Sequence, residues 1–143
     1  HDLPAQAGGA GLFSTVDDYM RFTQFLLNSG KVGDQQLIKA ETVAIMCSNQ
    51  LQGDALEYCH NTEKPGYGYG FGVRSLLTPD KSGLKANIGE FGWDGSASTW
   101  SGTDTGYEVT AVFMIQLFPF CHFPADREFQ EIMYSAFAKA FKD

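Results

Sequence analysis

The first candidates for chemistry in this chain are serines placed to act as nucleophiles. A serine followed three residues later by a lysine can be activated when both side chains lie on one face of a helix. One such string occurs, from Ser82 to Lys85, but it follows Pro79-Asp80 in a dense turn signal. A turn gives Lys85 no fixed geometry from which to take the proton of Ser82. No Gly-x-Ser-x-Gly elbow is present either, so we expect no complete catalytic set in these residues.

Cysteine and histidine form a second candidate group, because thiolate and imidazole are ligands that zinc prefers. Cys59-His60 and Cys121-His122 are adjacent pairs, and Cys47 is a third thiol. The spacing lacks a Cys-x-x-Cys unit. The favoured alternative is a Cys59–Cys121 disulfide, or free loop thiols with solvent-facing histidines. We expect neither a metal site nor a cofactor.

Local signals predict three helices that would position such groups. Ser14 or Thr15 can cap the first helix, because each precedes an aspartate by three residues. Asp17 and Asp18 then complement the helix dipole and are not expected to act as an acid–base pair. The expected helices run from about Val16 to Asn28, from Ala40 to Cys47 and from Pro124 to the C-terminal end, the last one lying across a sheet.

The intervening sequence predicts an antiparallel sheet of about three strands. Gly66 to Val73 alternates large and minimal side chains with a period of two, which is typical of a strand. Ile88 to Thr103 and Tyr107 to Leu117 are the other two expected strands, joined by a tight turn at Asp104-Thr105-Gly106. Helices before and after an antiparallel sheet define the α+β class.

The predicted organisation divides the chain near residue 65. Residues 1–65 form a helical segment that ends in a polar, aperiodic surface loop from Asn49 to Pro65, and residues 66–143 form the sheet with the last helix. The chain begins at His1 without an initiator methionine or a signal region, which makes a fragment of a larger protein an expectation from the start.

Composition narrows the classes of function. The formal net charge is −7 and no basic run could neutralise a row of phosphates, so nucleic acid is not an expected partner. The longest apolar stretch, Val109 to Leu117, is interrupted by polar residues and is too short to cross a bilayer. The three cysteines leave the cellular compartment open.

Four segments of the chain are informative through their order and spacing. They are Gly8 to Tyr19, the glycine-alternating strand Tyr67 to Val73, Phe91-Gly92-Trp93-Asp94-Gly95, and Val112 to Gln116. Taken in order, they resemble the C-terminal portion of the serine β-lactamase-like family, which includes class C β-lactamases, related esterases and penicillin-binding-protein-like peptidases. The resemblance covers nearly the whole chain and implies a partial β-lactamase/transpeptidase-like fold.

Only one of the family's three active-site motifs has a counterpart here. The chain contains no Tyr-x-Asn and no Ser-x-x-Lys at a helix start, but Trp93-Asp94-Gly95 resembles the Trp-Gly-Gly form found on a sheet strand of esterase-like members. By resemblance, the backbone N–H of Ser96 would donate to the oxyanion hole. Asp94 departs from the small residue of that form, and a carboxylate there is expected to repel an anionic substrate.

The resemblance implies the C-terminal fragment of a serine hydrolase that is inactive alone. Its expected partners are the missing N-terminal portion, which carries the nucleophile and further strands, and a second copy docked on the exposed sheet. An ester, a β-lactam or a peptide would be the substrate of the complete enzyme. The alternative is an oligomerisation module or a peptidoglycan- or sugar-binding module that uses Tyr67, Tyr69 and Trp100 as an exposed aromatic platform.

Overall fold

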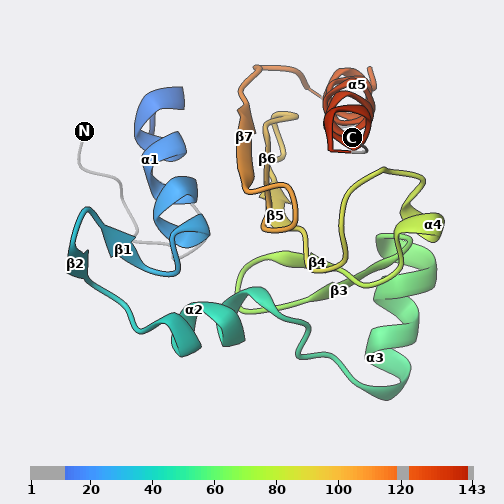
Figure 1. Ribbon diagram of the computed structural model, residues 1–143. Coiled ribbons are helices and arrows are strands. Elements are labelled where there is room, and N and C mark those ends of the chain that lie inside the picture. The colour runs from blue at the N-terminus through green and yellow to red at the C-terminus, as the bar shows by residue number, and fades with distance from the viewer. Residues whose placement is uncertain (1–11, 119–122, 142–143) are drawn as a thin grey trace, which may run out of the picture.

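The computed structural model describes residues 12–118 and 123–141, and it shows one five-stranded antiparallel sheet with helices on both faces (Figure 1). The strand order is β3-β4-β5-β6-β7, so each strand pairs with its neighbour in sequence. This arrangement confirms the predicted α+β class. The strands are β3 (Tyr67–Tyr69), β4 (Arg74–Leu76), β5 (Phe91–Asp94), β6 (Trp100–Asp104) and β7 (Val109–Phe113).

The sheet has five strands and not three, because one predicted strand is a hairpin and because β4 lies outside all three predicted strands. Where a single strand was predicted from Gly66 to Val73, β3 ends at Tyr69 and the chain reverses through Gly72, whose φ is +85°. β4 then returns with Arg74 opposite Tyr69. The expected strand from Ile88 to Thr103 likewise reverses between β5 and β6, with Asp94 opposite Trp100. A run of glycines that alternate with large residues can therefore contain a turn, here at Gly72, as well as a strand.

The first helix follows its local signals closely. Helix α1 (Val16–Leu27) begins after Thr15, whose hydroxyl accepts a hydrogen bond from the Asp18 N–H at 3.2 Å. The chain leaves α1 through Gly30, which has φ +83° and lies so close to Ile38 O that a Cβ would be 2.3 Å away. After Gly30 the chain forms a two-stranded antiparallel ribbon, β1 (Lys31–Val32) with β2 (Gln35–Gln36).

Helix α2 (Ala40–Cys47) has the predicted bounds and packs on the same face of the sheet as α1. Val43 and Cys47 of α2 form one core cluster with Leu26 of α1 and Phe91 of β5. Burial raises the pKa of the Cys47 thiol to about 11. Cys47 therefore contributes to packing as a neutral side chain.

The opposite face is covered by α5 (Ala125–Ala140), which begins after Pro124 as predicted. Its Phe129 and Tyr134 rings lie edge-on to Trp100 of β6, with centroids 6.0 and 6.5 Å away. Figure 1 shows α1 and α5 on opposite sides of strands β5 to β7. The sheet is thus the middle layer of three, as expected for a sheet with two apolar faces.

The segment from Asn49 to Pro65 is not the loop that its polar composition predicted. It contains α3 (Gly53–Tyr58), which continues into a π-helical turn, η1 (Cys59–Glu63). A short helix without a buried face has no apolar periodicity, so α3 could not be predicted from the pattern of apolar residues. A further one-turn helix, α4 (Pro79–Ser82), occupies the predicted turn. None of the helices in the described part of the chain is long and apolar enough to cross a bilayer.

Substitution Gly92→Ala is expected to destabilise the sheet. Gly92 is in β5, and a Cβ there would lie 2.0 Å from Ser101 O of the adjacent strand, where only backbone movement could relieve the overlap. We expect a loss of about 1–3 kcal/mol in the free energy of unfolding, measured by urea denaturation. The control is Gly33→Asn at an open turn position with φ +56°, which should change stability little because Asn tolerates this conformation.

Candidate active site

The predicted site residues lie at the end of β5, where one edge of the strand is open. β5 pairs with β6 from Phe91 to Asp94, but on its other side it pairs with β4 only at Phe91 and Gly92. Trp93 and Asp94 therefore have no strand beside them on the β4 side in the described part of the chain. An extended group can approach the backbone along such an edge.

A tight turn presents Ser96 beyond this edge. Ser98 N–H donates to Gly95 O at 3.0 Å, and Gly95 N–H donates to Thr99 O at 2.8 Å. A Cβ on Gly95 would lie 2.1 Å from the Thr99 hydroxyl oxygen, so a larger residue here would force the Thr99 side chain to move. Ser96 itself is exposed, and the turn thus leaves its N–H free of any acceptor within the described residues.

Trp93 stands beside the open edge with its ring partly exposed, at 39% of its full accessible area. The Tyr69 ring of β3 lies edge-on to it, with centroids 5.2 Å apart. The Lys64 ammonium lies over the Trp93 ring, 5.4 Å from its centroid. Trp93 is therefore fixed from two sides and still presents apolar surface, which suits it to line a binding site.

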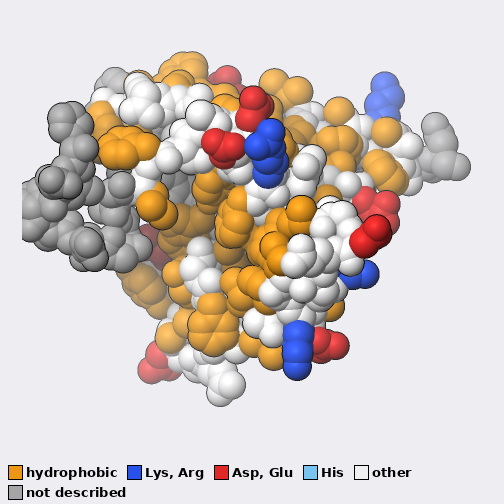
Figure 2. Space-filling view, turned by 90° about the vertical axis from the view of Figure 1, so that its left-hand side faces the viewer, with side chains coloured by type: hydrophobic (Ala, Val, Ile, Leu, Met, Phe, Trp, Pro, Cys, Tyr) orange, Lys and Arg blue, Asp and Glu red, His pale blue; other side chains and the backbone are white. Residues whose placement is uncertain are grey.

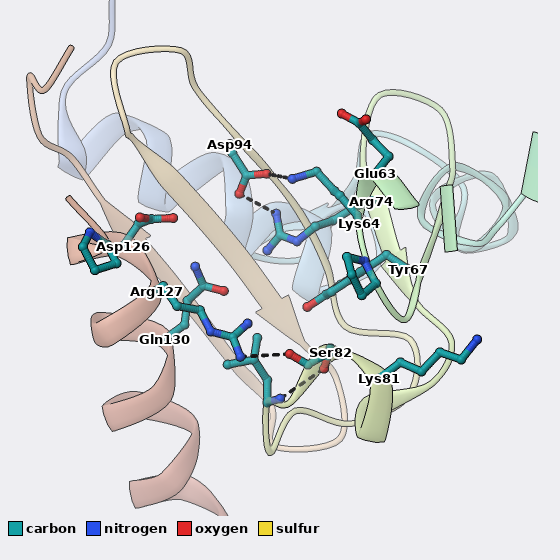
Figure 3. Close-up of a pocket in the computed structure, with 13 residues that line it drawn as sticks. Glu63, Lys64, Tyr67, Arg74, Lys81, Ser82, Asp94, Asp126, Arg127 and Gln130 are labelled. Atoms are coloured by element: carbon teal, nitrogen blue, oxygen red, sulfur yellow. Dashed lines mark hydrogen bonds and ion pairs between the residues drawn. The ribbon is translucent and has the colours of Figure 1, made fainter. Parts of the chain in front are cut away.

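Asp94 points to the α5 side of the sheet, toward two cations. Its carboxylate forms an ion pair with Lys64 and lies 3.5 Å from Arg74 Nη1 (Figure 3). The Asp94 side chain is 13% exposed. The sequence predicted that a carboxylate here would repel anionic ligands. The structure adds that Asp94 carries its own counter-ions.

Arg74 is the centre of a buried charge cluster on β4. Its side chain is 3% exposed, donates to Glu90 Oε1 at 2.9 Å and to Ser101 O at 3.0 Å, and lies between the rings of Tyr67 and Trp100. Burial disfavours the charged guanidinium, but Glu90 and Asp94 outweigh burial and hold the pKa of Arg74 above its ordinary value. Burial raises the pKa of Glu90, and Arg74 opposes this rise.

A cavity of about 430 Å³ opens beside Asp94 (Figure 3). Lys64 and Arg74 line it from the sheet side, and Arg127 and Gln130 line it from α5. A second cavity of about 250 Å³ touches Trp93, Asp94 and Gly95 together with Tyr19 of α1. Asp94 thus borders both cavities, and Trp93 and Gly95 border the second one. Both cavities are of a size that holds small organic groups.

The other sequence candidates do not assemble a catalytic group. Ser82 is the last residue of α4 and not the first, and its hydroxyl donates to Pro79 O at 2.8 Å and accepts from Leu84 N–H at 3.1 Å. No hydrogen bond joins Ser82 to the Lys85 side chain in the described part of the chain. Asp17 and Asp18 lie in the first turn of α1, as predicted.

The predicted aromatic platform is wrong for two of its three residues. Tyr67 and Trp100 are only 6% and 2% exposed and belong to the core beneath α5. Both side chains point toward this core because they lie on the sheet face that α5 covers. Only Tyr69 remains partly accessible, against Trp93.

The cysteine and histidine candidates are tested only in part. Cys121 and His122 lie outside the described residues, so the disulfide with Cys59 and the zinc alternative stay predictions. Cys59 and His60 begin the π-helical turn, whereas Cys47 is buried on α2.

Sequence reasoning missed Lys64, Arg74 and Glu90. Arg74 stands alone before the run Ser75-Leu76-Leu77, and Glu90 directly precedes the apolar start of β5. Single opposite charges within two apolar strands could have signalled a buried ion pair, because unpaired charges are rarely buried. Lys64 gives no comparable signal, since it follows a polar segment.

The fold and this strand motif define a class of protein, and the comparisons agree with it. The family model described as Beta-lactamase matches residues 1–131, so the chain belongs to the β-lactamase family of hydrolases. Protein Rv1367c of Mycobacterium tuberculosis (strain H37Rv) is 28% identical over 116 residues, which are 78% of this chain and 29% of that protein. The corresponding protein of strain CDC 1551, MT1414, gives the same values.

Solved structures of two relatives share the fold. EstCE1, described as a hydrolase with promiscuous acyltransferase activity, superimposes with a TM-score of 0.66 at 21% identity, over 85% of this chain and 29% of that one. Simvastatin synthase (LovD) from Aspergillus terreus gives a TM-score of 0.68 at 18% identity, over 87% of this chain and 34% of that one. The chain thus spans about a third or less of the length of each of these proteins.

Proposed function

We propose that this chain is the C-terminal part of a serine hydrolase and forms one wall of its active site. The observation that carries the proposal is the open edge of β5, where Trp93 and the N–H of Ser96 are both accessible. The nucleophile and its proton-transfer partner would come from the portion that precedes the chain. The coverage of the relatives supports this division, since most of their length has no counterpart here.

Two surfaces of the chain suit a missing portion. β7 pairs only with β6 within the described residues, so its outer edge offers unpaired backbone groups to further strands. Apolar side chains also gather on the face that carries α1 and α2 (Figure 2), and the exposed ones there include Phe22 and Ile45. Both features fit a domain whose remaining elements lie elsewhere in the sequence.

In the proposed serine hydrolase mechanism, this chain stabilises the negative charge of the tetrahedral intermediate and does not supply the nucleophile. A serine hydroxyl of the preceding portion attacks the substrate carbonyl and passes its proton through a base to the leaving group. The carbonyl oxygen becomes negative in the tetrahedral intermediate, and Ser96 N–H donates a hydrogen bond to it. The bond to the leaving group then breaks, and water hydrolyses the acyl–serine ester to free the enzyme.

The proposed substrate class is an ester. The Trp-x-Gly form of the strand motif resembles esterase-like members more than dedicated β-lactamases, and EstCE1 is described as a hydrolase with acyltransferase activity. The full-length protein should hydrolyse 4-nitrophenyl butyrate faster than a chromogenic cephalosporin, and the isolated chain should hydrolyse neither. Equal turnover by the isolated chain, or none by the full-length protein, would refute the proposal.

An oligomerisation module is the second candidate, and the free edge of β7 favours it. In that case the full-length protein would lack esterase activity and would form a concentration-dependent dimer by light scattering. Charged substitutions on β7, such as Val112→Lys, would then dissociate the dimer.

A further inference from the structure

Asp94 occupies the position where the resembling Trp-Gly-Gly form has a small residue, and its carboxylate lies between two cations. Lys64 pairs with one carboxylate oxygen, and Arg74 Nη1 lies 3.5 Å from the other. The three side chains are 13%, 26% and 3% exposed for Asp94, Lys64 and Arg74. The group is therefore largely shielded from water, where ion pairs are screened less than at the surface.

On the side that faces the cavity, Asp94 is the carboxylate that pairs with both Lys64 and Arg74. Nη2 of Arg74 is satisfied by Glu90 and Ser101 O, but Nη1 is buried and makes no hydrogen bond within the described residues. Lys64 has no other carboxylate within ion-pair distance in the same part of the chain. Without the Asp94 side chain, an ammonium and a guanidinium N–H would face the same space beside β5.

The other two cations that line the cavity, Lys81 and Arg127, differ from Lys64 and Arg74. Lys81 is exposed to solvent and donates to Asn61 Oδ1. Arg127 donates to Ser82 O at 2.9 Å and to Glu131 at 2.7 Å. The cavity lining also contains the carboxylates of Glu63 and Asp126. Together with Asp94, these carboxylates nearly balance the positive charges of the lining. With Asp94 present, an anionic ligand therefore meets no unpaired positive charge on the sheet side of the cavity.

We propose that Asp94 is a specificity-determining residue, an internal counter-ion that makes this cavity select uncharged esters over esters that carry a carboxylate. The inference rests on the proposed function, since it concerns the substrate of the same site. A ligand carboxylate would have to displace Asp94 from Lys64 and Arg74 or lie beside a like charge in a poorly solvated space. An uncharged group pays neither cost.

The test compares matched substrates on the full-length protein and its Asp94→Gly variant. One pair differs in the acyl group, 4-nitrophenyl butyrate against mono-4-nitrophenyl succinate, and one in the leaving group, methyl 4-acetoxybenzoate against 4-acetoxybenzoate. The natural protein should prefer the neutral member of each pair. Asp94→Gly should shift the ratio of kcat/KM values toward the anionic member by about tenfold or more in at least one pair.

A matched control separates this effect from a general change in charge. Asp80→Asn also removes one negative charge, from an exposed position on α4 that does not line the cavity. This variant should leave both ratios within about twofold. Ratios that stay unchanged in both substrate pairs for Asp94→Gly would overturn the proposal.

If the full-length protein hydrolyses no ester, the proposed function is refuted but the counter-ion role of Asp94 is not. A direct binding measurement tests that role separately. Benzoate is titrated into each variant while tryptophan fluorescence is followed, because Trp93 lies beside Lys64. Asp94→Gly should bind benzoate at least about tenfold more tightly than the natural protein. Asp94→Asn keeps the side-chain volume and provides the second variant if glycine disturbs folding. Equal dissociation constants for all three proteins would contradict the counter-ion role.

Discussion

Replacing Arg74 by methionine is expected to lower the free energy of unfolding by about 3–5 kcal/mol, the usual cost of breaking a buried ion pair. The reason is Glu90, which is 1% exposed and would lose its 2.9 Å partner while remaining inside the sheet face under α5. The substitution also removes the cation between the rings of Tyr67 and Trp100. Urea denaturation monitored by circular dichroism measures the loss.

A surface ion pair provides the control for this effect. Arg21 pairs with Asp18 at 3.4 Å on α1, where the two side chains are 79% and 64% exposed. Arg21→Met should therefore leave the unfolding midpoint nearly unchanged. The double variant Arg74→Met with Glu90→Gln should recover part of the loss, because it no longer buries an unpaired carboxylate. Similar midpoints for Arg74→Met and Arg21→Met would show that the cluster does not stabilise the fold.

Substitution Ser96→Pro should reduce kcat/KM of the full-length protein for 4-nitrophenyl butyrate by about 100- to 1000-fold, the range measured when one oxyanion donor is removed. Proline deletes the backbone N–H that the proposal places on the developing oxyanion. Ser96 is the second residue of the turn closed by Ser98 N–H and Gly95 O, a position that favours proline. The turn should therefore keep its shape while the donor is lost.

Ser96→Ala is the matched variant, because it removes the hydroxyl and keeps the N–H. Its kcat/KM should stay within about threefold of the natural protein, since a backbone donor does not depend on the side chain. Melting temperatures of both variants report on folding. If Ser96→Pro retains its melting temperature and its full activity, Ser96 N–H does not stabilise the transition state.

The elements that the sequence predicted well are those defined by neighbouring residues. Thr15 with Asp18 specifies the start of α1, and Pro124 with the apolar stripe that follows specifies α5. The β3–β4 and β5–β6 hairpins were missed because Gly72 and the turn after Gly95 lie within stretches that also fit one long strand. A period-two pattern does not show where a strand reverses.

The residues of the candidate site also differ in whether neighbouring residues in the sequence are enough to predict them. Trp93, Gly95 and Ser96 could be proposed as site residues from the sequence because they are close together in it and resemble a family motif. The partners of Asp94 could not, because Lys64 and Arg74 come from segments 30 and 20 residues away and meet Asp94 only when β4 packs beside β5. The negative charge of Asp94 can be read from the sequence, but its ion pairs with Lys64 and Arg74 form only in the folded structure.

Covalent labelling distinguishes a nucleophile within this chain from one in the portion proposed to precede it. The full-length protein is treated with a fluorophosphonate that reacts with activated serines, and the labelled peptide is identified by mass spectrometry. One labelled serine is expected, in the portion that precedes this chain. Loss of labelling is also expected when that serine is changed to alanine. Label on Ser82 or on any other serine of these 143 residues would contradict the proposed place of the nucleophile.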